Sequence, residues 1–271
     1  MAAKNTYDES KIKTLSSLEH IRLRTGMYIG RLGNGSNPDD GIYILLKEVL
    51  DNSIDEFIMG NGDRIDALLK DNKVTVRDYG RGIPLGKVVE CVSVINTGAK
   101  YNDEVFQFSV GLNGVGTKAV NALSEYFRVV SVRDGKYAEA VFERGVLKHE
   151  KQGDAKKGIK NGTLVEFIPD REIFGDYTFN LDFIEKRMWN YAYLNAGLML
   201  TFNGASYVSE NGLLDLLNAE IGEETLYTIA HFKEAKLEFA FTHTNNYGET
   251  YFSFVNGQYT SDGGTHLSAF K

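Results

Sequence analysis

Cysteine, proline and long apolar runs are all scarce in this sequence. One cysteine, Cys91, among 271 residues excludes an internal disulfide and a zinc site made of several cysteines. No apolar run approaches the roughly 18 to 20 residues that cross a bilayer, and the N-terminus lacks the charged-then-apolar order of a signal peptide. We therefore expect a soluble, cytoplasmic protein with no membrane partner.

Positive charge is scarce as well. Lys and Arg number 30 against 37 Asp and Glu, which gives a net charge of −7. Because phosphate backbones are bound by clustered Lys and Arg, this balance argues against a chain that clamps nucleic acid by itself. A hydrophobic content of 42% is ample for a packed core.

The chain is organised around a predicted helix over about residues 42–59. It contains the run Lys47-Glu48-Val49-Leu50-Asp51-Asn52-Ser53-Ile54-Asp55-Glu56. Helical periodicity places Glu48, Asn52 and Asp55 on one stripe and apolar residues on the opposite side. Such a stripe is commonly the solvated face of an amphipathic helix. The alternative is a site that combines a general base, a metal-holding oxygen and an orienting acid.

A second polar position follows a predicted strand over residues 74–77. Asp78 ends this strand and precedes the turn Tyr79-Gly80-Arg81-Gly82-Ile83-Pro84. An aspartate at such a place is often an ordinary turn former. The functional alternative is an acceptor for an exocyclic amino group, as in adenine, with Gly82 letting the base approach the backbone.

A third feature is the glycine-rich run Gly111-Leu112-Asn113-Gly114-Val115-Gly116, which leads into a predicted helix over about residues 117–124. Amides at a helix start suit a phosphate, although a surface loop without a ligand has the same composition. A P-loop is excluded, because that motif has Lys directly after its second glycine, whereas Thr117 follows Gly116 here.

The remaining pattern predicts an α+β protein with an antiparallel sheet that helices cover on one face. Ser16-Ser17-Leu18-Glu19 predicts a capping box that opens a short helix. Hairpins are predicted between residues 127 and 169. Further helices are predicted over residues 85–96, 182–196 and 213–221, and further strands over residues 198–202, 236–243 and 250–256.

The same pattern divides the chain into three parts. Residues 1–15 are expected to form an arm that orders on meeting another surface. Residues 16–222 are expected to form the main domain. After the predicted helix over residues 213–221, the predicted strands belong to a new unit. Residues 223–271 are predicted to be the truncated start of this second α/β domain.

Taken in order, these elements resemble the Bergerat fold of the GHKL ATPases. The resemblance rests on the acid and amide on one helix, Asp-x-Gly-x-Gly after a strand, the second glycine run at a helix start, and Gly162-Thr163 opening a later strand. It implies a two-layer sandwich of a mixed, mainly antiparallel sheet with helices on one face.

Flanking segments narrow the resemblance to the ATPase subunit of a bacterial type II topoisomerase, which means the B subunit of either DNA gyrase or topoisomerase IV. These segments are Tyr7-Asp8, Ile21-Arg22-Leu23-Arg24-Thr25-Gly26-Met27-Tyr28-Ile29-Gly30, Asn121-Ala122-Leu123-Ser124 and Asp262-Gly263-Gly264-Thr265-His266. The resemblance covers essentially the whole chain.

The resemblance implies that ATP and Mg²⁺ bind to this chain. Glu48 would be the general base for the attacking water, and Asn52 would hold Mg²⁺. Asp78 would accept a hydrogen bond from adenine, with Thr163 helping through a shared water. Asp55 and Glu56 would support that end of the helix from behind. The other residues implied in the ATP site are Tyr7, Arg81, Gly82, Ile83, Pro84, Lys100, Leu112, Asn113, Gly114, Val115, Gly116 and Arg133.

The resemblance also implies partners. The arm would cross to a second subunit and give an ATP-dependent homodimer, while the full-length enzyme would bind DNA and a DNA-cleaving A-type subunit. The family's second domain supplies a lysine to the γ-phosphate from beyond residue 271, so this chain is expected to bind ATP but to hydrolyse it poorly. Asn113 and Thr25 stand where many bacterial members have His and Pro, which leaves gyrase and topoisomerase IV both open, with a preference for the latter.

Two other classes remain as alternatives. One is another GHKL ATPase clamp, of the mismatch-repair or chaperone type, which the segment from Arg22 to Gly30 disfavours. The other is a dimerisation module that responds to nucleotide without meaningful turnover. A histidine-kinase catalytic domain would need a helix that carries a phosphoacceptor histidine, and the sequence supplies none.

Overall fold

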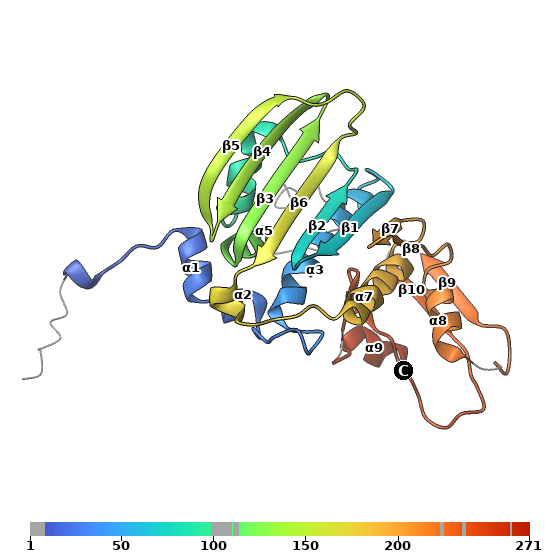
Figure 1. Ribbon diagram of the computed structural model, residues 1–271. Helices are drawn as coiled ribbons and strands as arrows, with labels where there is room; N and C mark the ends of the chain where they lie inside the picture. Colours follow the sequence, from blue (N-terminus) through green and yellow to red (C-terminus); the bar gives the residue numbers. More distant parts are fainter. Residues whose placement is uncertain (1–8, 99–109, 111–113, 223–224, 235–236, 261) are drawn as a thin grey trace, which may run out of the picture.

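The computed structural model describes residues 9–98, 110, 114–222, 225–234, 237–260 and 262–271. The described part begins in a short turn of helix, η1 (Glu9–Lys11), which lies apart from the sheet and its helices (Figure 1). Ile12 beyond it is 66% exposed. The first described residues therefore lie open to solvent.

A sheet of eight strands forms the larger part of the structure, in the order β5-β4-β3-β6-β2-β1-β7-β8. Its neighbours pair antiparallel, except that β1 and β7 pair parallel. The strands are β1 (Arg64–Lys70), β2 (Lys73–Asp78), β3 (Ser124–Arg133), β4 (Lys136–Glu143), β5 (Val146–Asp154), β6 (Gly162–Pro169), β7 (Met199–Phe202) and β8 (Ala205–Tyr207). This is the mixed, mainly antiparallel sheet that was predicted.

Helices cover one face of this sheet (Figure 1). The strands alternate, so that residues such as Val76, Phe127 and Phe167 are fully buried beneath the helices while their neighbours face the other side. The helices of this part are α1 (Ser17–Leu23), α2 (Gly26–Ile29), α3 (Gly41–Ile58), η2 (Leu85–Lys87), α4 (Val88–Ser93), α5 (Gly116–Ala122), α6 (Arg171–Phe174) and α7 (Leu181–Leu194). The predicted fold class is confirmed.

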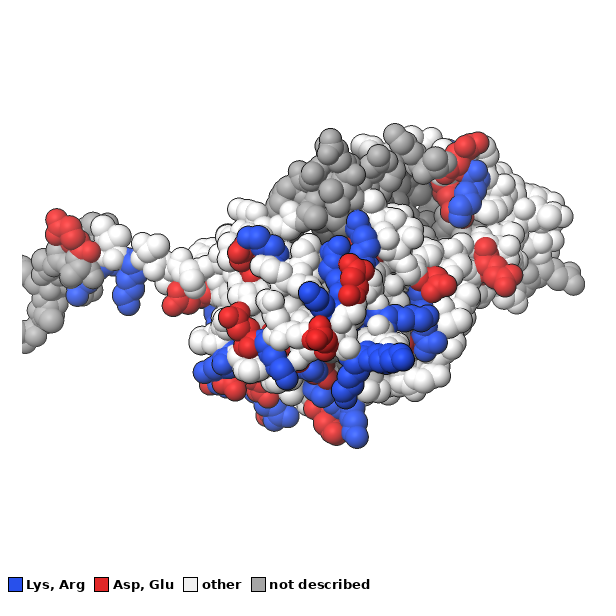
Figure 2. Space-filling view, turned by 90° about the horizontal axis from the view of Figure 1, so that it is seen from above, with Lys and Arg blue, Asp and Glu red and all other residues white. Residues whose placement is uncertain are grey.

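The opposite face of the sheet carries charge pairs between neighbouring strands. Arg128 on β3 contacts Glu166 on β6 at 2.9 Å and Glu139 on β4 at 3.2 Å. Lys73 on β2 adds a contact of 3.3 Å with Glu166. Figure 2 shows Lys and Arg side chains interspersed with Asp and Glu side chains on the molecule seen from above. Arg128 and Lys73 are thus each paired with a carboxylate on a neighbouring strand.

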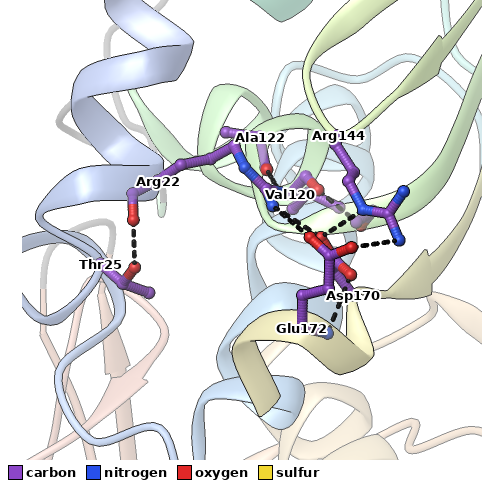
Figure 3. A network of polar contacts seen from close by, with 8 residues as sticks. Arg22, Thr25, Val120, Ala122, Arg144, Asp170 and Glu172 are labelled. Carbon is purple, nitrogen blue, oxygen red and sulfur yellow. Dashed lines mark hydrogen bonds and ion pairs between the residues drawn. The ribbon is translucent and has the colours of Figure 1, made fainter. Parts of the chain in front are cut away.

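The segment around Arg22 has a structural role that the sequence did not indicate. Its guanidinium donates to the carbonyl of Ala122 and to the buried carboxylate of Asp170, both at 2.7 Å, and Arg144 binds the same carboxylate at 3.0 Å (Figure 3). Thr25 Oγ1 donates to the carbonyl of Arg22 at 3.0 Å. Arg22 thus joins α1 to the end of α5 and to the chain after β6.

The C-terminal part packs through α8 (Leu213–Ile221), which contacts α7 and β10. Beyond α8 come two hairpins and a last helix. These elements are β9 (Ala230–Glu234), β10 (Leu237–Phe241), β11 (Phe254–Val255), β12 (Gln258–Tyr259) and α9 (Thr265–Phe270). In the described part of the chain, no helix combines the length and the apolarity that a bilayer crossing requires.

Three predicted elements differ in extent from the structure. The helix over residues 85–96 is broken into η2 and α4 and ends at Ser93, because Val94 has extended dihedrals. The strand over residues 250–256 is confined to Phe254–Val255, because the positive φ angles of Asn256 and Gly257 close a tight two-residue turn there. The strand over residues 236–243 is Leu237–Phe241.

Candidate functional site

A cavity of about 670 Å³ lies between α3, the turn after β2, the start of β6 and the start of α5. Thirteen residues predicted from the sequence line this one cavity. They are Glu48, Asn52, Glu56, Asp78, Arg81, Gly82, Ile83, Pro84, Gly114, Val115, Gly116, Arg133 and Thr163. Four more, Tyr7, Lys100, Leu112 and Asn113, lie outside the described residues.

Asp78 forms one end of the cavity and is 5% exposed. Its Oδ1 accepts the backbone N–H groups of Gly80 at 2.9 Å and Thr163 at 3.0 Å. Burial raises the pKa of Asp78 to about 6, against the opposing effect of these two hydrogen bonds. At neutral pH the site therefore presents a buried carboxylate that can accept a hydrogen bond from a ligand.

The turn after Asp78 is held against β3. Gly82 has a φ of +74°, and a Cβ there would lie 2.7 Å from the carbonyl oxygen of Val132. Arg133 donates to the carbonyl of Gly82 at 3.1 Å, and Ser131 Oγ donates to that of Ile83 at 2.7 Å. Gly82 was expected to admit a base to the backbone, and the structure shows that the packing of the turn already requires a glycine.

Arg81 and Glu56 form a charge pair at the wall of the cavity. The guanidinium of Arg81 contacts Glu56 at 2.9 Å, and Glu56 Oε2 also accepts the backbone N–H of Arg81 at 2.8 Å. A Cβ at Gly80 would lie 2.7 Å from Glu56 Cβ. Glu56 therefore anchors the turn to α3, which places it in a supporting role.

Glu48 and Asn52 lie one turn apart on α3 at the other end of the cavity. Asn52 Nδ2 donates to the carbonyl of Glu48 at 2.7 Å and to Thr117 Oγ1 at 2.8 Å. A Cβ at Gly116 would lie 1.8 Å from Glu48 Oε2, so the carboxylate occupies the space that this glycine leaves. α3 and the start of α5 thus fit together around these two side chains.

Asp55 shares the predicted helical stripe with Glu48 and Asn52 but is buried outside the cavity. It is 1% exposed, it does not line the cavity, and its Oδ1 accepts the backbone N–H of Val110 at 2.6 Å. Asp55 follows Glu48 by seven residues, or about two turns, so it points to the same side of the helix. It lies about 10 Å further along the helix axis. Asp55 therefore holds Val110 rather than facing the cavity, in keeping with the supporting role that the resemblance implies for it at this end of the helix.

Sequence reasoning missed a polar cluster behind Glu48. The buried carboxylate of Asp51 accepts three hydrogen bonds. They come from Lys47 Nζ at 2.6 Å, Tyr191 Oη at 2.5 Å and Gln258 Nε2 at 3.3 Å. Lys47 Nζ also lies 3.8 Å from Glu48 Oε1. Lys47 and Asp51 have the spacing of an ordinary i,i+4 pair, so spacing alone does not reveal the further partners of Asp51.

The contribution of the β11–β12 hairpin to the cavity was missed as well. Five residues of this region line the cavity, namely Val255, Asn256, Gln258, Tyr259 and Thr260. Gln258 Nε2 donates to the carbonyl of Val110 at 3.1 Å, in addition to Asp51. Contacts between segments so far apart in the chain leave no local pattern in a single sequence.

The oxygen atoms at the Glu48 end suit a hard cation. The described residues contain no group of three or more His, Cys, Asp or Glu that could hold a metal by themselves. Mg²⁺, however, is commonly bound through one or two protein oxygens together with the phosphates of a nucleotide. The amide oxygen of Asn52 fits such a site, in which the phosphates and water supply the other donors.

Comparison with known proteins places this chain among ATPases. Residues 37–172 match the model of the histidine kinase-, DNA gyrase B-, and HSP90-like ATPase family, and residues 206–271 match the DNA gyrase B model. The B subunit of DNA topoisomerase 4 from Borreliella burgdorferi is 64% identical over 98% of the chain. The B subunit of DNA gyrase from Thermus thermophilus is 38% identical, also over 98% of the chain.

A solved structure is similar throughout. The crystal structure of the 43K ATPase domain of Thermus thermophilus gyrase B, in complex with an aminocoumarin, matches 95% of this chain and 70% of that one, with a TM-score of 0.77 and 33% identity. The chain spans 44% and 45% of the length of the two curated relatives. It therefore belongs to the histidine kinase-, DNA gyrase B-, and HSP90-like ATPase family, in the branch of bacterial type II topoisomerase B subunits.

Proposed function

We propose that this chain binds ATP with Mg²⁺ in the cavity and hydrolyses it slowly, as the ATPase region of a type II DNA topoisomerase. The observation that carries the proposal is the placement of Asp78 at one end of a single cavity and of Glu48 and Asn52 at the other. A cavity of about 670 Å³ is of the size that small-molecule and cofactor sites have. Membership of the ATPase family supports a nucleoside triphosphate as the occupant.

The base end would recognise adenine through Asp78. Its buried carboxylate accepts hydrogen bonds, and the exocyclic amino group of adenine donates them. Gly80 and Thr163 fix Oδ1 by their backbone N–H groups, which leaves the carboxylate in one orientation. A purine with a carbonyl at the same position would lose this hydrogen bond.

The other end would carry out the hydrolysis. Glu48 would take a proton from the attacking water, and Asn52 would offer its Oδ1 to the cation. Bound Mg²⁺ would neutralise charge on the triphosphate. Gly116 admits the Glu48 carboxylate to this position, and Gly114 and Val115 line the cavity beside it.

The partners follow from the same proposal. In the complete protein, ATP binding would drive dimerisation through the N-terminal arm and would trap DNA beside a DNA-cleaving A-type subunit. The position of η1 away from the sheet, together with the exposed Ile12, supports an arm that is available to a second copy. The division into an arm of residues 1–15, an ATP-binding domain of residues 16–222 and the start of a second domain belongs to this proposal.

The test compares wild type with Glu48→Ala, with Glu143→Ala as a control on the exposed end of β4. Steady-state phosphate release should be slow in wild type and in the control, and about 100-fold slower in Glu48→Ala, because a general base is removed. A non-hydrolysable ATP analogue with Mg²⁺ should raise the melting temperature of all three and increase the mass of wild type in solution. Equal release by wild type and Glu48→Ala would favour a nucleotide-responsive module without catalysis.

A further inference from the structure

The side-chain amide of Asn52 is held by two acceptors from two different helices. Nδ2 donates to the backbone carbonyl of Glu48, which belongs to α3 itself, and to the hydroxyl of Thr117 in the first turn of α5. The distances of 2.7 and 2.8 Å are those of good hydrogen bonds. An amide nitrogen carries two hydrogens, so this geometry uses both of them.

These contacts fix which amide atom faces which way. A carbonyl oxygen only accepts hydrogen bonds, so the atom of Asn52 that faces the Glu48 carbonyl must be the nitrogen. The amide oxygen consequently has a defined direction, and it is the amide atom that can coordinate a hard cation. The Glu48 carbonyl lies on the same helix, whereas Thr117 is the acceptor that relates the amide to another element.

We propose that Thr117 is a positioning residue that orients the Asn52 amide so that its oxygen meets the cation bound with a nucleoside triphosphate. This inference rests on the proposed function, in which Asn52 holds Mg²⁺. Thr117 lines the same cavity as Asn52. It follows Gly116, whose missing Cβ leaves room for the Glu48 carboxylate. Two consecutive residues of α5 therefore set the positions of both functional side chains of α3.

Thr117→Val and Thr117→Ser form a matched pair that tests the hydroxyl. Valine keeps the size and branching of threonine and removes the acceptor, whereas serine keeps the acceptor. The probe is adenylyl imidodiphosphate, and calorimetry measures its affinity once with Mg²⁺ and once with EDTA. We expect Thr117→Val to bind about five- to tenfold more weakly with Mg²⁺ and unchanged with EDTA, and Thr117→Ser to bind like wild type in both.

A double variant tests whether Thr117 acts through Asn52. Asn52→Ala should abolish most of the gain in affinity that Mg²⁺ gives, and adding Thr117→Val to it should change the affinity no further. Additive losses would overturn the proposal, as would an equal loss with Mg²⁺ and with EDTA in Thr117→Val, since that result marks a purely structural role. Failure of serine to restore the affinity would overturn it too.

The wild type separates this proposal from the one on which it rests. If wild type binds the analogue more tightly with Mg²⁺ than with EDTA, the proposed cofactor is supported, and the variants then decide the role of Thr117. If wild type shows no binding, the proposed function is overturned together with this inference. Melting temperatures without nucleotide should agree within about 2 °C among wild type and the two Thr117 variants, because an exchange at one partly buried hydroxyl changes stability little.

Discussion

At one end of the cavity Asp78 is held by Gly80, two residues away, and by Thr163 on β6, the strand that pairs with β2. At the other end Glu48 and Asn52 depend on Gly116 and Thr117 at the start of α5, more than 60 residues along the chain. The first arrangement is fixed by a sheet and a turn. The second arises where two helices meet.

The second end also depends on the C-terminal part of the chain. Gln258 on β12 donates to Asp51 behind Glu48 and to the carbonyl of Val110, and the N–H of Val110 in turn binds Asp55. Different parts of a structure open with different free energies, and core strands are among the last to open. The comparison shows that the end proposed to recognise the base is held by a strand and its turn, while the end proposed for hydrolysis depends on contacts with distant segments.

Asp78→Asn should break the base end and produce the largest effect. We expect about 100-fold weaker binding of ATP, because the amide would present a donor where the adenine amino group needs an acceptor. Calorimetry with inosine triphosphate should show a much smaller loss, since that base carries a carbonyl in place of the amino group. Equal losses for the two nucleotides would contradict the assignment of Asp78 to the base.

The same variant has an expected effect on stability with a defined sign. Burial raises the pKa of Asp78 from 3.8 to about 6, so the folded state holds a proton that the unfolded state has released between these pH values. The contribution of Asp78 to the unfolding free energy therefore falls as pH rises from about 4 to about 6, by up to about 3 kcal/mol.

An asparagine at this position does not titrate, so the unfolding free energy would not fall with pH on its account. Its amide oxygen can still accept from the N–H groups of Gly80 and Thr163. The stability gain of Asp78→Asn over wild type should accordingly grow between about pH 4 and pH 6 and then level off, which thermal unfolding across this pH range can measure. A gain that is constant with pH would contradict this account.

Gly116→Ala should break the hydrolytic end and leave the base end intact. A Cβ at this position would lie 1.8 Å from Glu48 Oε2, so the carboxylate must move. We expect phosphate release to fall about 30-fold, since small misplacements of a reacting group are costly. The affinity for ADP in EDTA should change less than about threefold.

Gly86→Ala is the matched control for this variant, because a Cβ there meets nothing within 4 Å. It should release phosphate at the rate of wild type. If Gly116→Ala weakened ADP binding as much as it slowed phosphate release, the two ends of the cavity would not be separable in the way proposed.

Gln258→Leu should give the smallest effect and sharpen the comparison. The variant removes the donor that links β12 to Asp51 and Val110, and leaves the sheet unchanged. We expect phosphate release to change by about threefold with ADP binding unaltered, because each lost bond is a modest one. Gln152→Leu on the exposed strand β5 serves as control, and a larger effect on ADP binding than on release would count against the link.

Much of the fold and part of the site could be predicted from the sequence. The capping box of α1 forms as expected, with Ser16 and Glu19 exchanging side-chain and backbone hydrogen bonds. The helix that carries Glu48 and Asn52, and the acid at the end of β2, were predictable because period and turn residues are local signals. Their assembly around one cavity followed from the resemblance to a family.

What the sequence could not show depends on contacts between distant segments. β1 was missed because apolar residues at 65, 68 and 69 suit a helix as well as a strand, and pairing with β2 and β7 decides the outcome. Thr117 and Gln258 carry no local pattern that marks them. That Asp55 does not reach the cavity could not be predicted from the stripe, because a helical stripe gives direction around the axis and not position along it.

The outermost strand of the sheet has a consequence for how copies of this chain can meet. All nine residues of β5 are exposed, and one side of the strand pairs with β4. Lys148 and Lys151 stand on this strand, and lysines on an edge oppose the addition of a further strand, because their charges would lose water. The β5 margin of the sheet is thereby protected against the addition of a further strand, so a second copy would have to bind through another surface.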